Sequence, residues 1–220
     1  MEITVDSVVG AKSYVGTLKR FANPKTRKYW ADVRDGLVII NPEYILSQLK
    51  IARERIQSAK NEGKDILLVS DKVIFRDEIK DICESQGIHY MNNNVPSGVF
   101  TNFDTLKSRI NSMLELSAFV ESSDFATLSK KEKQQTIKKL NKLKLIYSGV
   151  KNLKKSPDFA IVLDGVALSS FVKEIEILGL DNVILSSTDF DKYWDSSSLV
   201  VSNITSYGSV KFVIEYLLKK

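Results

Sequence analysis

The stretch from Ser129 to Lys155 concentrates residues suited to one kind of chemistry, the neutralisation of negative charge. It contains ten lysines and a single acid, Glu132. Exposed helices usually mix Glu with Lys at i,i+4 for support, whereas a helix this one-sided repels itself unless an anion neutralises it. We therefore predict a basic helical arm that binds a polyanion, RNA in the first place. The alternative is a solvated lysine-rich helix without a ligand.

A second basic segment lies near the N-terminus. Between residues 7 and 31 there are six basic residues and no acid: Lys12, Lys19, Arg20, Lys25, Arg27 and Lys28. Lys and Arg pair with phosphates, and an exposed aromatic ring such as Tyr29 can stack on an unpaired base. For Trp30 we favour packing, in which the ring pins this extended segment to the domain core. The basic residues suggest no such internal role.

Residues for catalysis or metal binding are few. His89 is the only histidine and lies in a predicted strand, and Cys83 is the only cysteine and lies on a predicted helix with apolar neighbours. Both are interpreted as packing residues. Four aspartates lie near predicted strand ends and could collect a divalent ion: Asp164, Asp189, Asp191 and Asp195. Loop acids are usually just solvated, so we predict no metal. With His89 and Cys83 assigned to packing, we also predict no catalytic residue and no cofactor.

The composition bounds the class of protein. A chain of 220 residues with 43% hydrophobic residues can build one core domain plus an appendage. A lone cysteine excludes a disulfide framework and favours a reducing compartment. No apolar run approaches a membrane span, and the N-terminus resembles neither a signal nor a transit peptide. We expect a cytoplasmic protein, or one in an organelle interior if it is organelle-encoded, with no membrane partner.

The elements that must position these residues alternate along the chain. Apolar runs predict strands at 37–40, 66–69, 88–91, 159–163, 183–185 and 199–201. Helical spacing predicts helices at 42–61, 73–85, 168–178 and 207–218. This alternation predicts an α/β fold with a doubly wound, mainly parallel five-stranded sheet of the flavodoxin-like or Rossmann-like kind, one strand fewer than the six apolar runs.

Two long helices interrupt this pattern after the third predicted strand. Helical spacing at 101–120 and 129–148, with a short turn between, predicts an inserted antiparallel hairpin of coiled-coil type. Ser129 and Glu132 match a capping box that opens the second arm. The expected seam consists of Leu106, Ile110, Met113 and Leu114 against Ile137, Leu140, the Lys144 stem and Tyr147. The chain then divides into an α/β domain at 1–100 and 156–220 and a hairpin at 101–155.

A doubly wound sheet also suggests a nucleotide or sugar-phosphate binding enzyme that uses the crevice at the strand ends. The residues disfavour it, because the loop after Val69 contains no glycine and no phosphate-binding glycine motif occurs. A third possibility is a protein-interaction module whose hairpin pairs with another coiled coil. It would need an apolar outer stripe, and the second arm carries lysines instead.

Several short motifs, in order along the chain, carry a family resemblance. Gly10 and Gly16 precede Asn23-Pro24-Lys25, Thr101-Asn102-Phe103 opens the hairpin, and Pro157-Asp158 introduces a strand. Leu128–Glu132 opens the second arm in the same style. In this order the chain resembles the ribosomal protein S2 family of the small subunit over nearly its whole length. The histidines of that family's opening motif are replaced here, and Asn94-Val95 stands for its Arg-Trp, which marks a divergent member.

The resemblance implies a structural, non-enzymatic component of the small ribosomal subunit. Members bind small-subunit rRNA between head and body with an α/β domain and a protruding hairpin. The implied partners are this rRNA and neighbouring small-subunit proteins, with ribosomal protein S1 as a further candidate. The expected RNA-binding residues are Lys12, Lys19, Arg20, Lys25, Arg27, Lys28, Asn102, Lys107, Arg109, Lys130, Lys131, Lys133, Lys138, Lys139 and Lys142. Gly98 is expected at a sharp turn before the hairpin.

Overall fold

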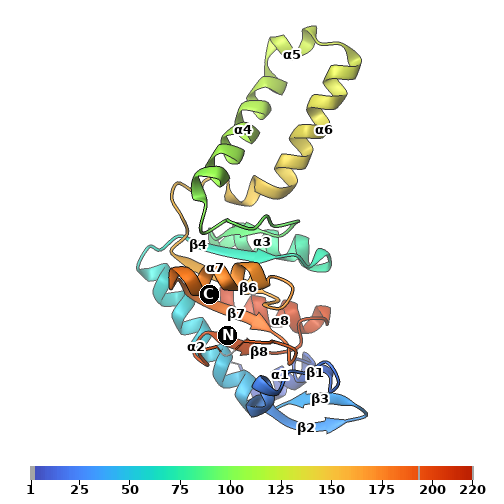
Figure 1. The fold of residues 1–220 in the computed structure, drawn as a ribbon, viewed down its shortest axis with the longest axis vertical. Coiled ribbons are helices and arrows are strands. Elements are labelled where there is room, and N and C mark those ends of the chain that lie inside the picture. Colours follow the sequence, from blue (N-terminus) through green and yellow to red (C-terminus); the bar gives the residue numbers. More distant parts are fainter. Residues whose placement is uncertain (1–2, 193, 220) are drawn as a thin grey trace.

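A computed structural model describes residues 3–192 and 194–219 of the chain. The molecule is elongated, with a helical hairpin at one end and a small antiparallel sheet at the other (Figure 1). Between them lies a parallel sheet covered by helices. Among the described residues, no helix is both long and apolar enough to cross a bilayer.

The central sheet has five strands, all parallel, in the order β5-β4-β6-β7-β8. The strands are β4 (Ile66–Ser70), β5 (His89–Met91), β6 (Phe159–Leu163), β7 (Asp181–Ser186) and β8 (Leu199–Val201). Every residue of β4 and β6 is buried, as expected for strands covered on both faces. The predicted doubly wound α/β fold is therefore confirmed.

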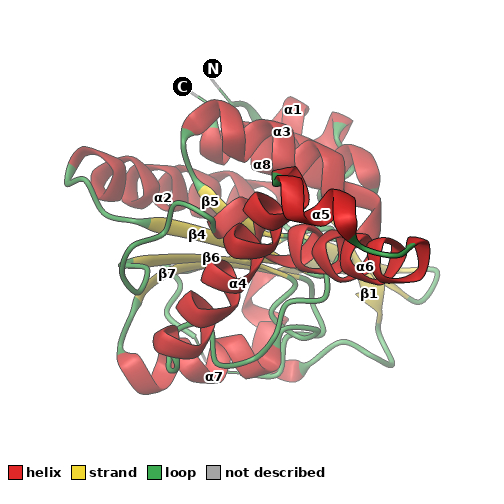
Figure 2. Ribbon diagram, turned by 90° about the horizontal axis from the view of Figure 1, so that it is seen from above, coloured by secondary structure: helices red, strands yellow, loops and turns green. Residues whose placement is uncertain are grey.

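Helices cover both faces of this sheet (Figure 2). One face carries α2 (Pro42–Asn61), α3 (Arg76–Gln86) and α8 (Tyr207–Leu218), and the other carries α7 (Ser169–Leu178). The start of α2 follows the expected rule: Asn41 caps it by accepting from the Glu43 N–H, and Pro42 occupies the first position. The helix α3 ends at Gly87, which is left-handed with φ of 66°.

The strand predicted at 37–40 belongs to a different sheet from the one expected. It is β3 (Leu37–Ile40), which pairs antiparallel with β1 (Val15–Leu18) and β2 (Trp30–Arg34). Asp35 and Gly36, with φ of 49° and 77°, form the two-residue turn between β2 and β3, and such a turn commits two strands to antiparallel pairing. Consequently the hairpin follows the second strand of the parallel sheet, where the sequence had suggested the third.

The hairpin consists of α4 (Phe103–Glu121), a short α5 (Ser123–Thr127) in the predicted turn, and α6 (Lys130–Tyr147), followed by the 3-10 turn η3 (Ser148–Val150). The expected seam is only partly right. Leu106, Ile110, Met113, Leu140 and Tyr147 are buried, whereas Leu114, Ile137 and Lys144 are exposed. On α6 the half-buried Thr136 and Leu143 complete the seam, so the inward face lies one residue away from Ile137 and Lys144.

The remaining elements are α1 (Val5–Gly10) and the 3-10 helices η1 (Pro24–Tyr29) and η2 (Val73–Phe75). Within η1, Tyr29 is buried. Trp30, at the start of β2, is half-buried against the core and donates its Nε1–H to Thr26 Oγ1 at 3.0 Å. The prediction that Trp30 packs is confirmed.

Candidate nucleic-acid interface

Four lysines of α6 lie on the side of the helix that faces away from α4. Spacings of seven and four residues align Lys131, Lys138 and Lys142, with Lys139 beside them, opposite the buried Leu140. All four are exposed. Within the described part of the chain, none of the four side chains has a hydrogen bond or an ion pair with another residue. We call Lys131, Lys138, Lys139 and Lys142 the lysine face. Lys130, at the first position of α6, is exposed in the same way.

The one acid of this stretch does not neutralise the lysine face. Glu132 accepts from the Ser129 N–H at 2.9 Å and from the Ser129 hydroxyl at 2.6 Å. In return, the Glu132 N–H donates to Ser129 Oγ at 3.4 Å. The predicted capping box is therefore confirmed. These hydrogen bonds from Ser129 lower the pKa of the Glu132 carboxyl. The carboxylate therefore interacts with the N-terminus of α6 and not with the lysine face.

Lys133 differs from the other lysines of α6. Its Nζ donates to the Ala126 carbonyl at 2.7 Å and lies 6.0 Å from the centre of the Phe125 ring. Phe125 in turn packs edge-on against Phe119. This lysine fastens the short α5 to α6, so its ammonium group already has an internal partner at the tip of the hairpin.

A buried carboxylate holds the root of the hairpin. Glu174 of α7 is only 8% exposed and accepts the N–H groups of Gly98, Phe100 and Thr101 at 2.6, 3.0 and 3.2 Å. Sequence reasoning missed this residue, although a signal exists: helical spacing puts Glu174 on the same face as Phe171 and Leu178. An acid on an apolar face must find donors, and here it finds the loop that opens α4.

Gly98 is at the sharp turn that the sequence predicted. Its φ is +86°, while an added Cβ would have its nearest contact at 3.7 Å. Backbone strain, and not crowding, therefore reserves the position for glycine. Four residues on, Asn102 caps α4 by accepting from the Thr105 hydroxyl at 2.9 Å and N–H at 3.4 Å.

The expected cations of α4 stand close to this root. Lys107 and Arg109 are both exposed. Arg109 borders a hollow of about 280 Å³ together with Asn102, Thr105 and the nearly buried Tyr147. The described structure gives neither Lys107 nor Arg109 a hydrogen bond or an ion pair. Both cations can therefore meet an external anion near the body.

The N-terminal basic segment is built differently, because two of its lysines have internal partners. Lys25 Nζ donates to the Asp191 carbonyl at 2.6 Å, and Lys28 Nζ donates to Ser196 Oγ at 3.0 Å. The expectation that these residues lack an internal role is therefore wrong for both. They tie η1 to the loop after β7. Thr188 in that loop strengthens the tie by accepting the Asn23 N–H at its carbonyl, at 2.8 Å.

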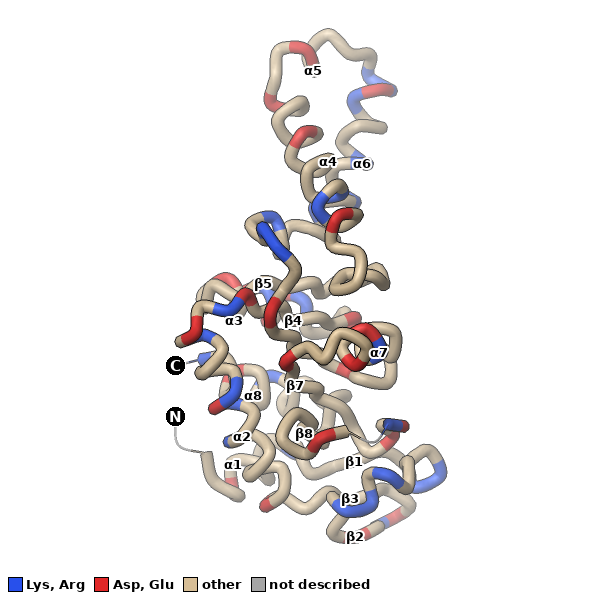
Figure 3. Tube along the Cα trace, turned by 60° about the vertical axis from the view of Figure 1, so that its left-hand side comes forward, with Lys and Arg blue, Asp and Glu red and all other residues tan. Residues whose placement is uncertain are grey.

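The other four cations of the segment are exposed: Lys12, Lys19, Arg20 and Arg27. Figure 3 shows Lys and Arg gathered beside β3 at one end of the molecule and along the hairpin at the other. The structure therefore does not bring the predicted basic residues into one patch. It separates them into two surfaces on either side of the parallel sheet.

Among the described residues, the aspartates near the strand ends are not grouped as a metal site. Asp164 pairs with Lys72 at 2.6 Å, and Asp195 bonds the neighbouring Ser197, which lowers the pKa of the Asp195 carboxyl. Burial raises the pKa of the Asp189 carboxyl. In the described residues, no three His, Cys, Asp or Glu side chains are grouped to hold a metal ion.

Side chains also occupy the crevice where a doubly wound sheet would bind a nucleotide. Phe190 is fully buried, and a Cβ added to Gly165 would come within 2.7 Å of its ring. The same crevice holds the Lys72–Asp164 ion pair. The alternative of a nucleotide-binding enzyme therefore gains no support from the strand ends.

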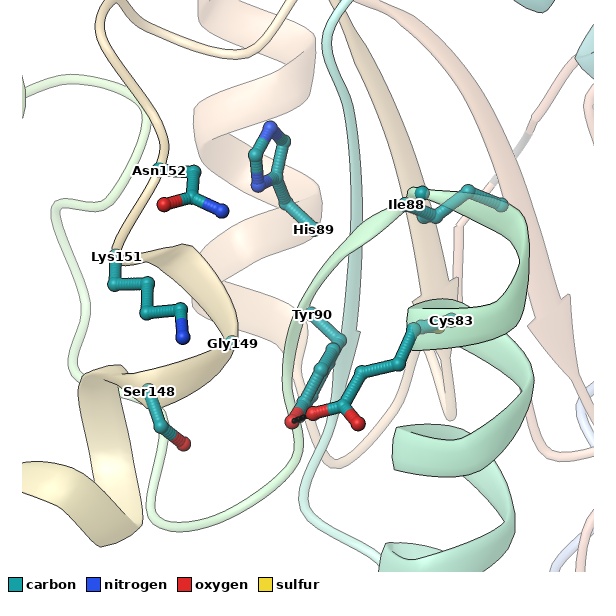
Figure 4. A pocket seen from close by; sticks show the side chains of 10 residues that line it. Cys83, Ile88, His89, Tyr90, Ser148, Gly149, Lys151 and Asn152 are labelled. Carbon is teal, nitrogen blue, oxygen red and sulfur yellow. Dashed lines mark hydrogen bonds between the residues drawn. The ribbon is translucent and has the colours of Figure 1, made fainter.

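His89 and Cys83 border a hollow of about 310 Å³ between β5 and η3 (Figure 4). Cys83 is buried as predicted, and burial raises the pKa of its thiol to about 12. The thiol therefore stays protonated and is a weak nucleophile at neutral pH. His89 Nε2 lies 3.8 Å from Asp65. Close packing fixes this region, since a Cβ on Gly149 would lie 2.2 Å from the Tyr90 carbonyl oxygen.

Comparison with known proteins identifies the family. A family model described as ribosomal protein S2 matches residues 8–219. The small ribosomal subunit protein uS2 of Coprothermobacter proteolyticus is 30% identical over 189 residues, which cover 86% of this chain and 70% of that protein. The uS2 proteins of Petrotoga mobilis and Fusobacterium nucleatum are 29% and 30% identical over 86% of this chain, covering 66% and 77% of their own lengths. The chain therefore belongs to the ribosomal protein S2 family.

Proposed function

We propose that this protein is a structural constituent of the small ribosomal subunit that binds small-subunit rRNA through two separated basic surfaces. One is the lysine face of α6 with Lys130 beside it. The other is formed by the exposed cations of the N-terminal segment. Membership of the S2 family and the similarity to proteins named small ribosomal subunit protein uS2 support the ribosomal role.

The observation that carries the RNA proposal is the lysine face itself. Neighbouring like charges at i,i+3 and i,i+4, such as Lys138 with Lys142, each destabilise a helix by a few tenths of a kcal/mol. Here no carboxylate among the described residues offsets that repulsion. A row of phosphates would offset it and would release condensed counterions at the same time. These side chains have no internal partner among the described residues, which supports an external anion as their ligand.

The two basic surfaces would act as a pair because rigid elements separate them. We assign residues 101–155 to a projecting arm and the remainder to the α/β body. Glu174 joins the arm to the body by three backbone hydrogen bonds. An arm fixed in this way loses little conformational entropy when it binds, which favours a defined position on a folded rRNA.

The experiment is sedimentation of the protein with small subunits that lack it, at low and at high salt. The variant reverses three lysines of the lysine face: Lys138→Glu, Lys139→Glu and Lys142→Glu. We expect it to fold and to bind weakly, with a salt dependence whose logarithmic slope is smaller by about 2 to 3, since each phosphate contact adds roughly 0.7 to 0.9.

A matched control reverses three exposed lysines on the body, Lys50, Lys80 and Lys173. It changes the net charge equally, so a loss confined to the first variant assigns the effect to the lysine face. Equal losses in both variants would reduce the proposal to non-specific attraction. Unchanged binding of the first variant would remove the lysine face from the interface. The same gradients also test association with neighbouring small-subunit proteins and with ribosomal protein S1.

A further inference from the structure

One aromatic side chain in the N-terminal segment lies in solvent although its neighbours are packed. Phe21 is 61% exposed, whereas Tyr29 is 3% exposed and Trp30 is half-buried. Phe21 lies in the loop between β1 and η1, next to Lys19 and Arg20. A phenyl ring that is 61% exposed gains only part of its burial energy from folding. Single exposed apolar residues are common on protein surfaces, so it is the position of Phe21 beside two cations that suggests a ligand.

The surroundings of Phe21 combine an apolar floor with positive charge. The Arg20 guanidinium lies 4.6 Å from the centre of the Phe21 ring. Leu18, Lys19, Arg20 and Gly36 border an open hollow of about 710 Å³. The Lys19 N–H donates to the Gly36 carbonyl at 2.8 Å, which fixes this loop against the turn between β2 and β3. Because Gly36 has no side chain, Leu18 stays partly uncovered.

We propose that Phe21 stacks on an unpaired base of the bound RNA while Lys19 and Arg20 contact the flanking phosphates. The inference rests on the proposed function and deepens it by naming the RNA element, a single-stranded nucleotide, that this surface takes. Every base has a π face, and an aromatic ring beside cations is the usual platform for it. A protein partner would more naturally bring an apolar face against Phe21 and Leu18, and the two adjacent cations would then be desolvated without a counter-charge.

The test uses a short single-stranded RNA that carries one 5-iodouridine, and the duplex of the same sequence. Irradiation should join the iodouridine of the single strand to Phe21, as read by mass spectrometry of the digested protein. In a binding titration, Phe21→Ala should weaken the single strand about tenfold, since one stacked base contributes roughly 1 to 3 kcal/mol. Its affinity for the duplex and its salt slope should not change. Phe21→Trp should restore binding of the single strand.

Ile74→Ala is the matched control, because Ile74 is 67% exposed and lies on η2, away from this loop. It should leave both affinities unchanged. The stacking inference is overturned if Phe21→Ala binds as the parent does, or if it weakens single strand and duplex alike with a smaller salt slope. It is also overturned if Phe21→Ala impairs only incorporation into the small subunit, because the ring would then contact a protein. Failure of the parent protein to bind either RNA at low salt would instead refute the proposed function.

Discussion

The hairpin and the N-terminal segment are both rich in cations but use several of them in different ways. On α6 the lysine face has no partner in the described structure, and the one nearby acid, Glu132, caps the helix. In the N-terminal segment Lys25 and Lys28 reach Asp191 and Ser196, far away in the sequence. A run of positive charge therefore indicates a ligand surface only where the fold gives those charges nothing else to contact.

The two regions also differ in how they are attached to the body. The N-terminal segment is fastened by hydrogen bonds spread over Asn23, Thr26, Lys25 and Lys28. At the root of the hairpin, one carboxylate, that of Glu174, accepts three backbone N–H groups, beside the packing of Val99, Phe100 and Val150 in the core. Dispersed hydrogen bonds lose little when one is removed, whereas a carboxylate that accepts three of them concentrates that loss in one side chain.

The largest effect is therefore expected from Glu174→Ala. It leaves three N–H groups without an acceptor at a buried site, so the free energy of unfolding should fall by about 3 to 5 kcal/mol. Denaturant titration followed by circular dichroism measures it. The control is Glu176→Ala two residues away, an exposed acid paired only with Lys192, which should change stability by no more than about 0.5 kcal/mol. Similar losses for both would show that the three hydrogen bonds to Glu174 contribute little to stability.

A smaller loss is expected when the turn beside that anchor is changed. Gly98→Val forces a β-branched residue into a left-handed backbone, at a cost of about 2 kcal/mol. Gly10→Val is the matched control, since an added Cβ there meets no atom within 4 Å and its φ lies outside the left-handed range. A thermal melt of Gly98→Val that coincides with that of the parent would contradict the backbone strain expected of valine at φ of +86°.

The N-terminal lysines should matter for stability where the hairpin lysines do not. Lys25→Met removes a charged donor from the Asp191 carbonyl, which should lower the free energy of unfolding by about 1 kcal/mol. Lys138→Met removes no contact and reduces the repulsion within α6, so its stability should stay equal or rise slightly. RNA affinity should show the reverse order. A larger loss of stability for Lys138→Met than for Lys25→Met would break the comparison between the two regions.

The sequence predicts most of this architecture because the periodicity of long elements is local information. The predicted bounds 42–61 and 207–218 match α2 and α8 in full. The cap formed by Ser129 and Glu132 was also predictable, because its two residues lie within one helical turn of each other. The membership of β3 was misjudged because the short Asp35-Gly36 turn outweighs the apolar run of Leu37–Ile40. The partners of Lys25 and Lys28 lie more than 160 residues away, so only the folded chain reveals which cations are already used.

The smallest expected effect is a pH dependence at the start of α6. Hydrogen bonds from Ser129 lower the pKa of Glu132 in the folded protein. A carboxyl with a depressed folded pKa contributes stability above its unfolded pKa, near 4.5, and loses that contribution as the pH falls through the lower folded value. Helicity measured by circular dichroism should therefore decrease slightly as the pH falls below this unfolded value. In Glu132→Gln that acid-dependent part should be absent, because Gln does not titrate.

RNA affinity of this variant should not fall, since an acid has been removed from a basic arm. Weaker RNA binding by Glu132→Gln with α6 still helical would mean that Glu132 itself contacts the ligand. The cap would then belong to the interface together with the lysine face.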